Sequence, residues 1–109
     1  MTEQPTQEPM IRLHRASLVL TLLAAHQELA ALPINWEIDD RDGLWPRVEH
    51  KSPDAERAAR AMAAALGARM HVDDVNGTPL YSVYGQWAGT KVSLQAFGPD
   101  SVDATEVTA

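Results

Sequence analysis

The side chains in this sequence best suited to metal or acid–base chemistry are three residues of two predicted hairpins, His50, His71 and Asp73. His71 and Asp73 lie two residues apart, so on a strand they share one face, and His50 can approach them from the other hairpin. Two imidazoles and one carboxylate form a ligand set that zinc or iron accepts. A metal-dependent enzyme ranks third among the functions considered, because His-x-Asp also occurs in ordinary solvent-facing strands.

No other pattern of catalytic or ligand residues is specific. The acidic turn 39–43 has some features of a calcium loop, but Arg41 interrupts the alternating ligands and a strand follows where an EF-hand has a helix. Ser17 and Ser82 lack the flanking glycines of a nucleophile elbow, and the chain has neither a glycine-rich phosphate loop nor a cysteine. We therefore expect a protein that is not an enzyme and that binds no metal or other cofactor.

The net charge of −6 comes from the two ends of the chain. Five of the 15 acidic residues lie in segments 1–9 and 98–109, which contain no Lys or Arg. The segment 10–97 therefore has 10 acids against 9 bases, so its bulk charge favours neither nucleic acid nor cationic partners. We expect one domain over 10–97 and disordered tails at 1–9 and 98–109.

The composition also bears on the cellular location. Residues 1–9 are polar and acidic, unlike a secretory signal, and the apolar-rich stretch 16–25 is about half of the ~20 residues that a helix needs to span a bilayer. We expect a soluble, cytoplasmic protein with no membrane partner.

Two segments have the period of amphipathic helices. The first, 10–31, ends before Pro33 and is apolar enough either to sink between other elements or to lend its outer side to a partner. The second runs from a cap at Ser52 to a stop at Gly67, and its many alanines allow it to lie close to a sheet.

Five segments have the alternation or the flanking turns of strands: 34–39, 44–50, 69–75, 78–87 and 90–97. Pro46 favours an edge position or a bulge in the second strand. Asn76-Gly77 is a strong hairpin signal, and Ala88-Gly89 turns the chain again. The order α-β-β-α-β-β-β predicts an α+β fold, with two helices packed on one face of a largely antiparallel sheet of four or five strands.

The turns and caps also carry a resemblance to known proteins. The motifs are Leu32-Pro33, the aliphatic-Trp strand, the Ser/Pro-capped alanine helix with its glycine stop, Val75-Asn76-Gly77 and Tyr84-Gly85. Over residues 10–97 the chain resembles small uncharacterised proteins of actinobacteria, some of them carried on phages and integrated elements. The resemblance implies a fold pattern and an origin in a mobile element, and it implies no activity.

The sheet face away from the helices is the candidate interaction surface. If Trp36, Val72, Val92 and Leu94 face the helices, alternation turns other residues outward. For strand 78–87 either Leu80 and Tyr84 or Tyr81 and Val83 face outward. The residues selected for this surface are Trp45, Arg47, His71, Tyr84, Lys91 and Phe97.

These observations favour a non-enzymatic protein-interaction or accessory protein. It would bind another protein through the open sheet face, or form a homodimer through helix 10–31. The alternative is a small nucleic-acid-associated regulator, because aromatic and cationic residues on an open sheet can stack on bases. Glu49 and Asp73 on the same face count against nucleic acid, so a protein partner ranks first.

Overall fold

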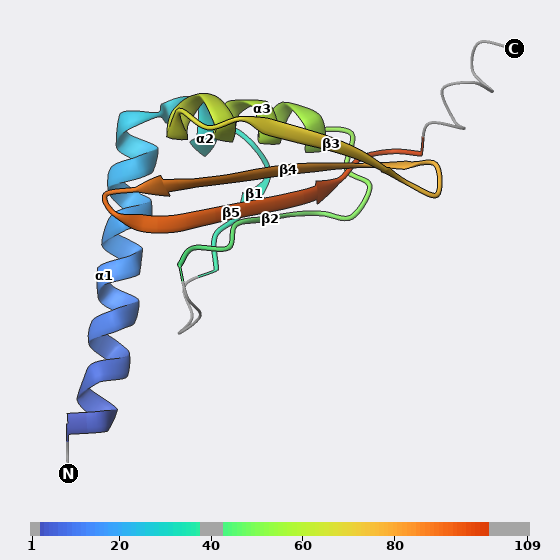
Figure 1. Cartoon of the computed structure of the whole chain (residues 1–109). Coiled ribbons are helices and arrows are strands. Elements are labelled where there is room, and N and C mark those ends of the chain that lie inside the picture. Colours follow the sequence, from blue (N-terminus) through green and yellow to red (C-terminus); the bar gives the residue numbers. More distant parts are fainter. Residues whose placement is uncertain (1–2, 38–42, 101–109) are drawn as a thin grey trace, which may run out of the picture.

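The computed structural model describes residues 3–37 and 43–100, and its side chains from Pro9 onward. It confirms the α+β class, with a five-stranded, mainly antiparallel sheet (Figure 1). The elements in chain order are α1 (Glu3–Ala25), α2 (Gln27–Ala30), β1 (Ile34–Asn35), β2 (Arg47–Val48), α3 (Ala55–Leu66), β3 (Met70–Val75), β4 (Thr78–Trp87) and β5 (Thr90–Phe97).

The strands follow the order β1-β2-β5-β4-β3, and only the β2–β5 pair is parallel. The turns between β3, β4 and β5 lie where the sequence predicts them. Asn76 and Gly77 have φ of 54° and 86°, and Ala88 and Gly89 have φ of 51° and 81°. Two consecutive residues with positive φ match the right-handed twist of the flanking strands, which explains these tight connections.

Helix α3 packs on the sheet over β4 and β5 and forms the centre of the core. Met62 on α3 and Val83, Val92 and Leu94 on the strands are completely buried. A Cβ added at Gly85 of β4 would lie only 3.1 Å from the Leu66 Cβ. The alanine-rich helix therefore comes closest to the sheet where the strand carries no side chain.

The C-terminal end of α3 lies where the sequence predicts it, whereas the helix begins at Ala55 with Asp54 as its N-cap, two residues beyond the predicted cap at Ser52. The Ser52 hydroxyl accepts a hydrogen bond from the Asp54 N–H at 3.1 Å, just before the helix begins at Ala55. Gly67 ends the helix with φ 63°, and its N–H donates hydrogen bonds to the carbonyls of Ala63 and Ala64. A left-handed glycine in this position satisfies carbonyl groups that the last turn leaves free.

The predicted helix 10–31 differs in both its start and its continuity. It begins at Glu3, so α1 includes most of the segment 1–9 that the composition assigns to a disordered tail. Pro5 lies in the first turn of α1, where backbone N–H groups have no acceptor within the helix, so its missing N–H breaks no hydrogen bond. Pro9 lies further along and removes only one backbone hydrogen bond of the helix. At His26 the backbone leaves the helical region (φ −132°, ψ 77°), and α2 starts anew. The His26 ring packs edge-on against Trp87, with centroids 5.7 Å apart.

Helix α1 stands beside the β4–β5 hairpin, and its N-terminal half extends past the sheet, whereas α2 and α3 cover the sheet face (Figure 1). Its C-terminal half is held by the buried Leu18 and Leu22, and by the Trp87 indole N–H, which donates to the Thr21 hydroxyl at 3.1 Å. In the described part of the chain, no helix is both long enough and apolar enough to cross a membrane.

The first hairpin is shorter than predicted. Within the described residues, the predicted strand 34–39 forms only β1, and the acidic residues 39–42 lie outside the described part. Leu44 makes an isolated parallel bridge with Val92, and regular pairing resumes at Arg47. Pro46 lies in the interruption, as its missing N–H requires. This strand lies between β1 and β5 and is therefore not at the edge.

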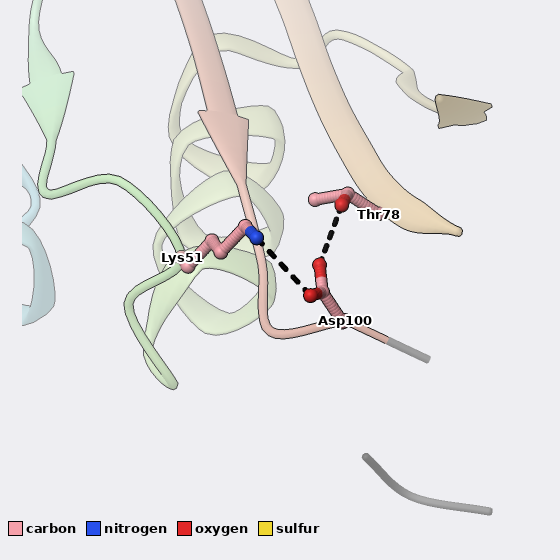
Figure 2. Close-up of polar contacts among 3 residues, drawn as sticks. All are labelled: Lys51, Thr78 and Asp100. Carbon is pink, nitrogen blue, oxygen red and sulfur yellow. Dashed lines mark hydrogen bonds and ion pairs between the residues drawn. The ribbon is translucent and has the colours of Figure 1, made fainter. Parts of the chain in front are cut away.

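The chain after β5 is anchored through Asp100, which the sequence assigns to the disordered segment 98–109. The Asp100 carboxylate accepts hydrogen bonds from the Thr78 hydroxyl at 2.5 Å and from the Lys51 ammonium at 3.1 Å (Figure 2). These two bonds, first that from Thr78, lower the pKa of Asp100 below its usual value. Residues 101–109 lie outside the described residues.

Leu22 and Leu20 on α1 provide a matched test of the core. Leu22 is 0% exposed and Leu20 is 69% exposed. We expect Leu22→Ala to lower the free energy of unfolding by about 2–5 kcal/mol, because it leaves a cavity in the core. Leu20→Ala should change it by less than about 0.5 kcal/mol. Urea unfolding followed by circular dichroism measures both, and equal losses would contradict the packing of α1.

Asp100 should make the protein less stable in acid. Because its pKa is lowered in the folded state, its contribution is present above the usual aspartate pKa and is lost as the pH falls below about 4. Asp100→Asn should therefore flatten the dependence of unfolding free energy on pH between 6 and 3, and Thr78→Val should do so in part. Parallel pH curves for wild type and Asp100→Asn would show that the two bonds do not persist in solution.

Candidate functional site

The strand register shows which side chains share the sheet face opposite α3. Tyr84 is paired with Ser93, and Leu80 with Phe97, whereas Val83 is paired with the buried Leu94. Directly paired residues lie on the same face of a sheet. Leu80 and Tyr84 therefore face the open side, which decides between the two phases that the sequence allows for β4.

A groove of about 350 Å³ lies on this open face beside β2 and β5. The residues that line it are Trp45, Pro46, Arg47, Val48, Ser93, Gln95 and Phe97. Arg47 forms an ion pair with Glu37, with 3.2 Å between Nε and Oε1, and both side chains are about half exposed. The groove offers a guanidinium, an amide, a hydroxyl and two aromatic rings. Aromatic rings beside a guanidinium and an amide are a set typical of protein-binding surfaces.

Hydrogen bonds and ring contacts hold the aromatic side chains next to this groove. The Gln95 amide donates to the Tyr84 hydroxyl at 2.6 Å, although Tyr84 is 51% exposed. The ring of Phe97 packs edge-on against His50, with centroids 5.3 Å apart. The open face therefore has a fixed shape near β5, and side chains held in place lose less entropy on binding.

The six residues predicted for the interaction surface do not form one cluster. Trp45, Arg47 and Phe97 line the groove, and Tyr84 adjoins it through Gln95. His71 lies on β3 at the far edge of the sheet, and Lys91 lies at the hairpin end of β5. The alternation in the sequence assigns each residue to a face of the sheet, but it does not give the order of the strands. That order places His71 away from Trp45, Arg47 and Phe97.

The third-ranked metal-binding candidate, His50, His71 and Asp73, is not brought together. His71 and Asp73 lie on β3, whereas His50 follows β2 and contacts Phe97, so β4 and β5 separate them. Among the residues that the structure describes, no three His, Asp or Glu side chains are close enough to hold a metal ion. The prediction of a cluster assumed that the two hairpins are adjacent, and the parallel β2–β5 pairing places them apart.

A second cavity, of about 660 Å³, lies between α1 and the β4–β5 hairpin. It is lined by Met10, Ile11, His14 and Arg15 from α1 and by Gln86, Gly89, Thr90 and Lys91 from the hairpin, with Gly43 between them. A Cβ at Gly43 would lie 2.7 Å from the Lys91 carbonyl oxygen, and Gly43 has φ 88°. Glycine is therefore required where this loop meets β5. The sequence contains no signal for the cavity, because it depends on where α1 stands.

The outer side of α1 carries the most exposed large apolar side chains of the described chain. Met10, Leu13 and Leu20 are 61%, 66% and 69% exposed. With Ser17 and Ala24, which are also exposed, they follow spacings of three, four, three and four residues. This α1 outer stripe (Met10, Leu13, Ser17, Leu20 and Ala24) has the repeat of a helix-packing seam. The sequence allows helix 10–31 to lend its outer side to a partner, and the structure shows which side chains that side exposes.

Comparison with known proteins does not assign the chain to a family. No family model, no curated protein and no solved structure matches it. The resemblance to small actinobacterial and phage-borne proteins therefore stays a prediction.

Proposed function

We propose that this protein is a non-enzymatic interaction domain that binds a partner protein through the α1 outer stripe. The observation that carries the proposal is the exposure of Met10, Leu13 and Leu20 on a helix whose other side is buried in the core. Full burial of each exposed leucine by a partner would contribute about 1.5–3 kcal/mol to the free energy of binding. A contiguous apolar strip of this kind is typical of protein interaction sites.

The pattern of the stripe indicates that the partner is a helix. Alternating spacings of three and four residues place side chains on one narrow seam, which packs best against the seam of a second helix. The outer stripe runs along α1 from the half that extends past the sheet to the half beside the β4–β5 hairpin (Figure 1). All five of its residues are exposed, so a partner helix can lie along them.

The charges beside the stripe indicate the chemistry of that helix. Between Pro9 and Ala25 the sequence contains two arginines and one histidine but no acid. With about 3.6 residues per turn, the exposed Arg12 and His14 lie on opposite sides of the stripe. An amphipathic helix with acidic residues next to its apolar seam complements this pattern, whereas a second copy of α1 would bring basic side chains together.

The structure also supports a low cost of binding. Leu18 and Leu22 in the core and the hydrogen bond from Trp87 to Thr21 hold the C-terminal half of α1 in place. A helix that is already formed and oriented loses little conformational entropy when it binds. The groove at Trp45, Arg47 and Phe97 is a second contact surface in this proposal, and a cytoplasmic location is part of it.

The test uses two synthetic amphipathic helices with the same leucine seam, one flanked by Glu and the other by Lys. We expect the Glu-flanked peptide to bind the full chain more tightly, measured by fluorescence anisotropy at low and high salt. Leu13→Gln/Leu20→Gln should weaken binding by about 100-fold or more, because two buried leucines are lost. Gln retains helix propensity and adds no charge. Val75→Gln, at the turn end of β3, is the control and should bind normally.

Four outcomes would contradict the proposal. Binding of neither peptide, or equal binding to the Leu13→Gln/Leu20→Gln variant, would show that the stripe is not a helix-binding seam. A homodimer abolished by the same variant would make a second copy its occupant. Nucleic acid that co-purifies, is released by salt and is lost with Arg47→Ala or Lys91→Ala would favour the regulator instead.

A further inference from the structure

Strand β3 forms an open edge of the sheet along its whole length. It is the last strand in the order β1-β2-β5-β4-β3, and it pairs with β4 from Met70 to Val75. Every residue after Met70 is exposed, and Val72 is 56% exposed. A long edge strand presents unpaired N–H and C=O groups that another strand can bind.

The turn decides which residues of β3 direct their backbone groups outward. Val75 and Thr78 flank the two-residue turn, and in such hairpins the flanking pair exchanges both backbone hydrogen bonds. Alternation then directs the N–H and C=O groups of Met70, Val72 and Asp74 away from β4. The carbonyl of Pro79, which is opposite Asp74, accepts from the Gly98 N–H, as this alternation requires.

We propose that β3 pairs antiparallel with β3 of a second copy, around a two-fold axis at Val72, so that two sheets become one. Outward-directed residues must meet each other in such a pair. In this register Val72 lies opposite Val72 of the second copy, and Met70 lies opposite Asp74 of the second copy. All three outward-directed residues of each strand obtain partners, and two exposed valine side chains come together.

The same register places a histidine opposite an aspartate. His71 lies opposite Asp73 of the second copy, and the two-fold axis repeats this pair. His71 and Asp73 are both on the open face of the sheet. Between the two β3 strands they occupy non-hydrogen-bonded positions, where cross-strand side chains are closest. A shift of the axis by one residue puts Asp73 opposite Asp73 of the second copy, or His71 opposite His71 of the second copy. Charges on an edge strand often prevent pairing, but here they select one register.

The contact is separate from the one proposed for α1. It uses the edge of the sheet and leaves the α1 outer stripe and the groove beside β2 untouched. Substitutions can therefore distinguish the two contacts. Those in β3 should weaken the homodimer and leave peptide binding unchanged, whereas those in α1 should weaken peptide binding and leave the homodimer unchanged.

The test is sedimentation equilibrium of the full chain over a range of concentrations at pH 6.5. We expect the 11.9 kDa chain to form a dimer. His71→Asp, which places aspartates opposite each other, should raise the dimer dissociation constant at least about tenfold, and Asp73→His should also raise it. The swap His71→Asp/Asp73→His should restore it to within about threefold of wild type. Leu13→Gln/Leu20→Gln should leave it unchanged.

A backbone test is independent of the charges. Val72→Pro removes an outward N–H and no bond to β4, so the monomer should stay folded by circular dichroism while the dimer is lost. Hydrogen exchange of the wild type should slow at the amides of Met70, Val72 and Asp74 as the dimer forms. A monomer at all concentrations, a swap variant that does not recover, or a dimer lost only with the α1 substitutions would overturn the proposal.

Discussion

The close packing of α3 against β4 and β5 is the contact on which the rest of the structure depends. The helix presents mainly alanine and methionine to the sheet, and it comes nearest where Gly85 lies below Leu66. Small side chains on both sides let the two layers approach, and the buried aliphatic residues of the strands fill the remaining space. The other strands are attached to this unit: β3 through β4, and β2 with β1 through β5.

Helix α1 is attached to the same unit by only part of its length, and this explains its two kinds of apolar residue. Its C-terminal half supplies Leu18 and Leu22 to the core, and Trp87 holds it through Thr21. On its outer side Leu13 and Leu20 are largely exposed. A helix with one side in the core and an apolar seam on the other is suited to joining two proteins.

The sheet adds two further surfaces that differ in kind. The groove near Trp45 and Phe97 offers fixed side chains, whereas the β3 edge offers backbone groups beside His71, Asp73 and Asp74. Side-chain surfaces select partners by shape and charge, and strand edges select them by register. A chain that dimerises through β3 would present two copies of α1, which would raise its avidity for a partner with repeated helices.

Local sequence alone determined the elements whose signals are short-range. The stop at Gly67 and the turn at Asn76-Gly77 depend on neighbouring residues and were found where they were predicted, whereas the N-cap of α3 lies at Asp54 and not at Ser52. The tertiary structure decided the position of β2, because its parallel pairing with β5 joins residues about 48 apart in the chain (Arg47 with Gln95). That pairing separates His50 from His71, so the third-ranked metal-binding candidate is not brought together. The position of α1 likewise depends on its contact with Trp87, so only the folded chain shows which of its leucines are left exposed.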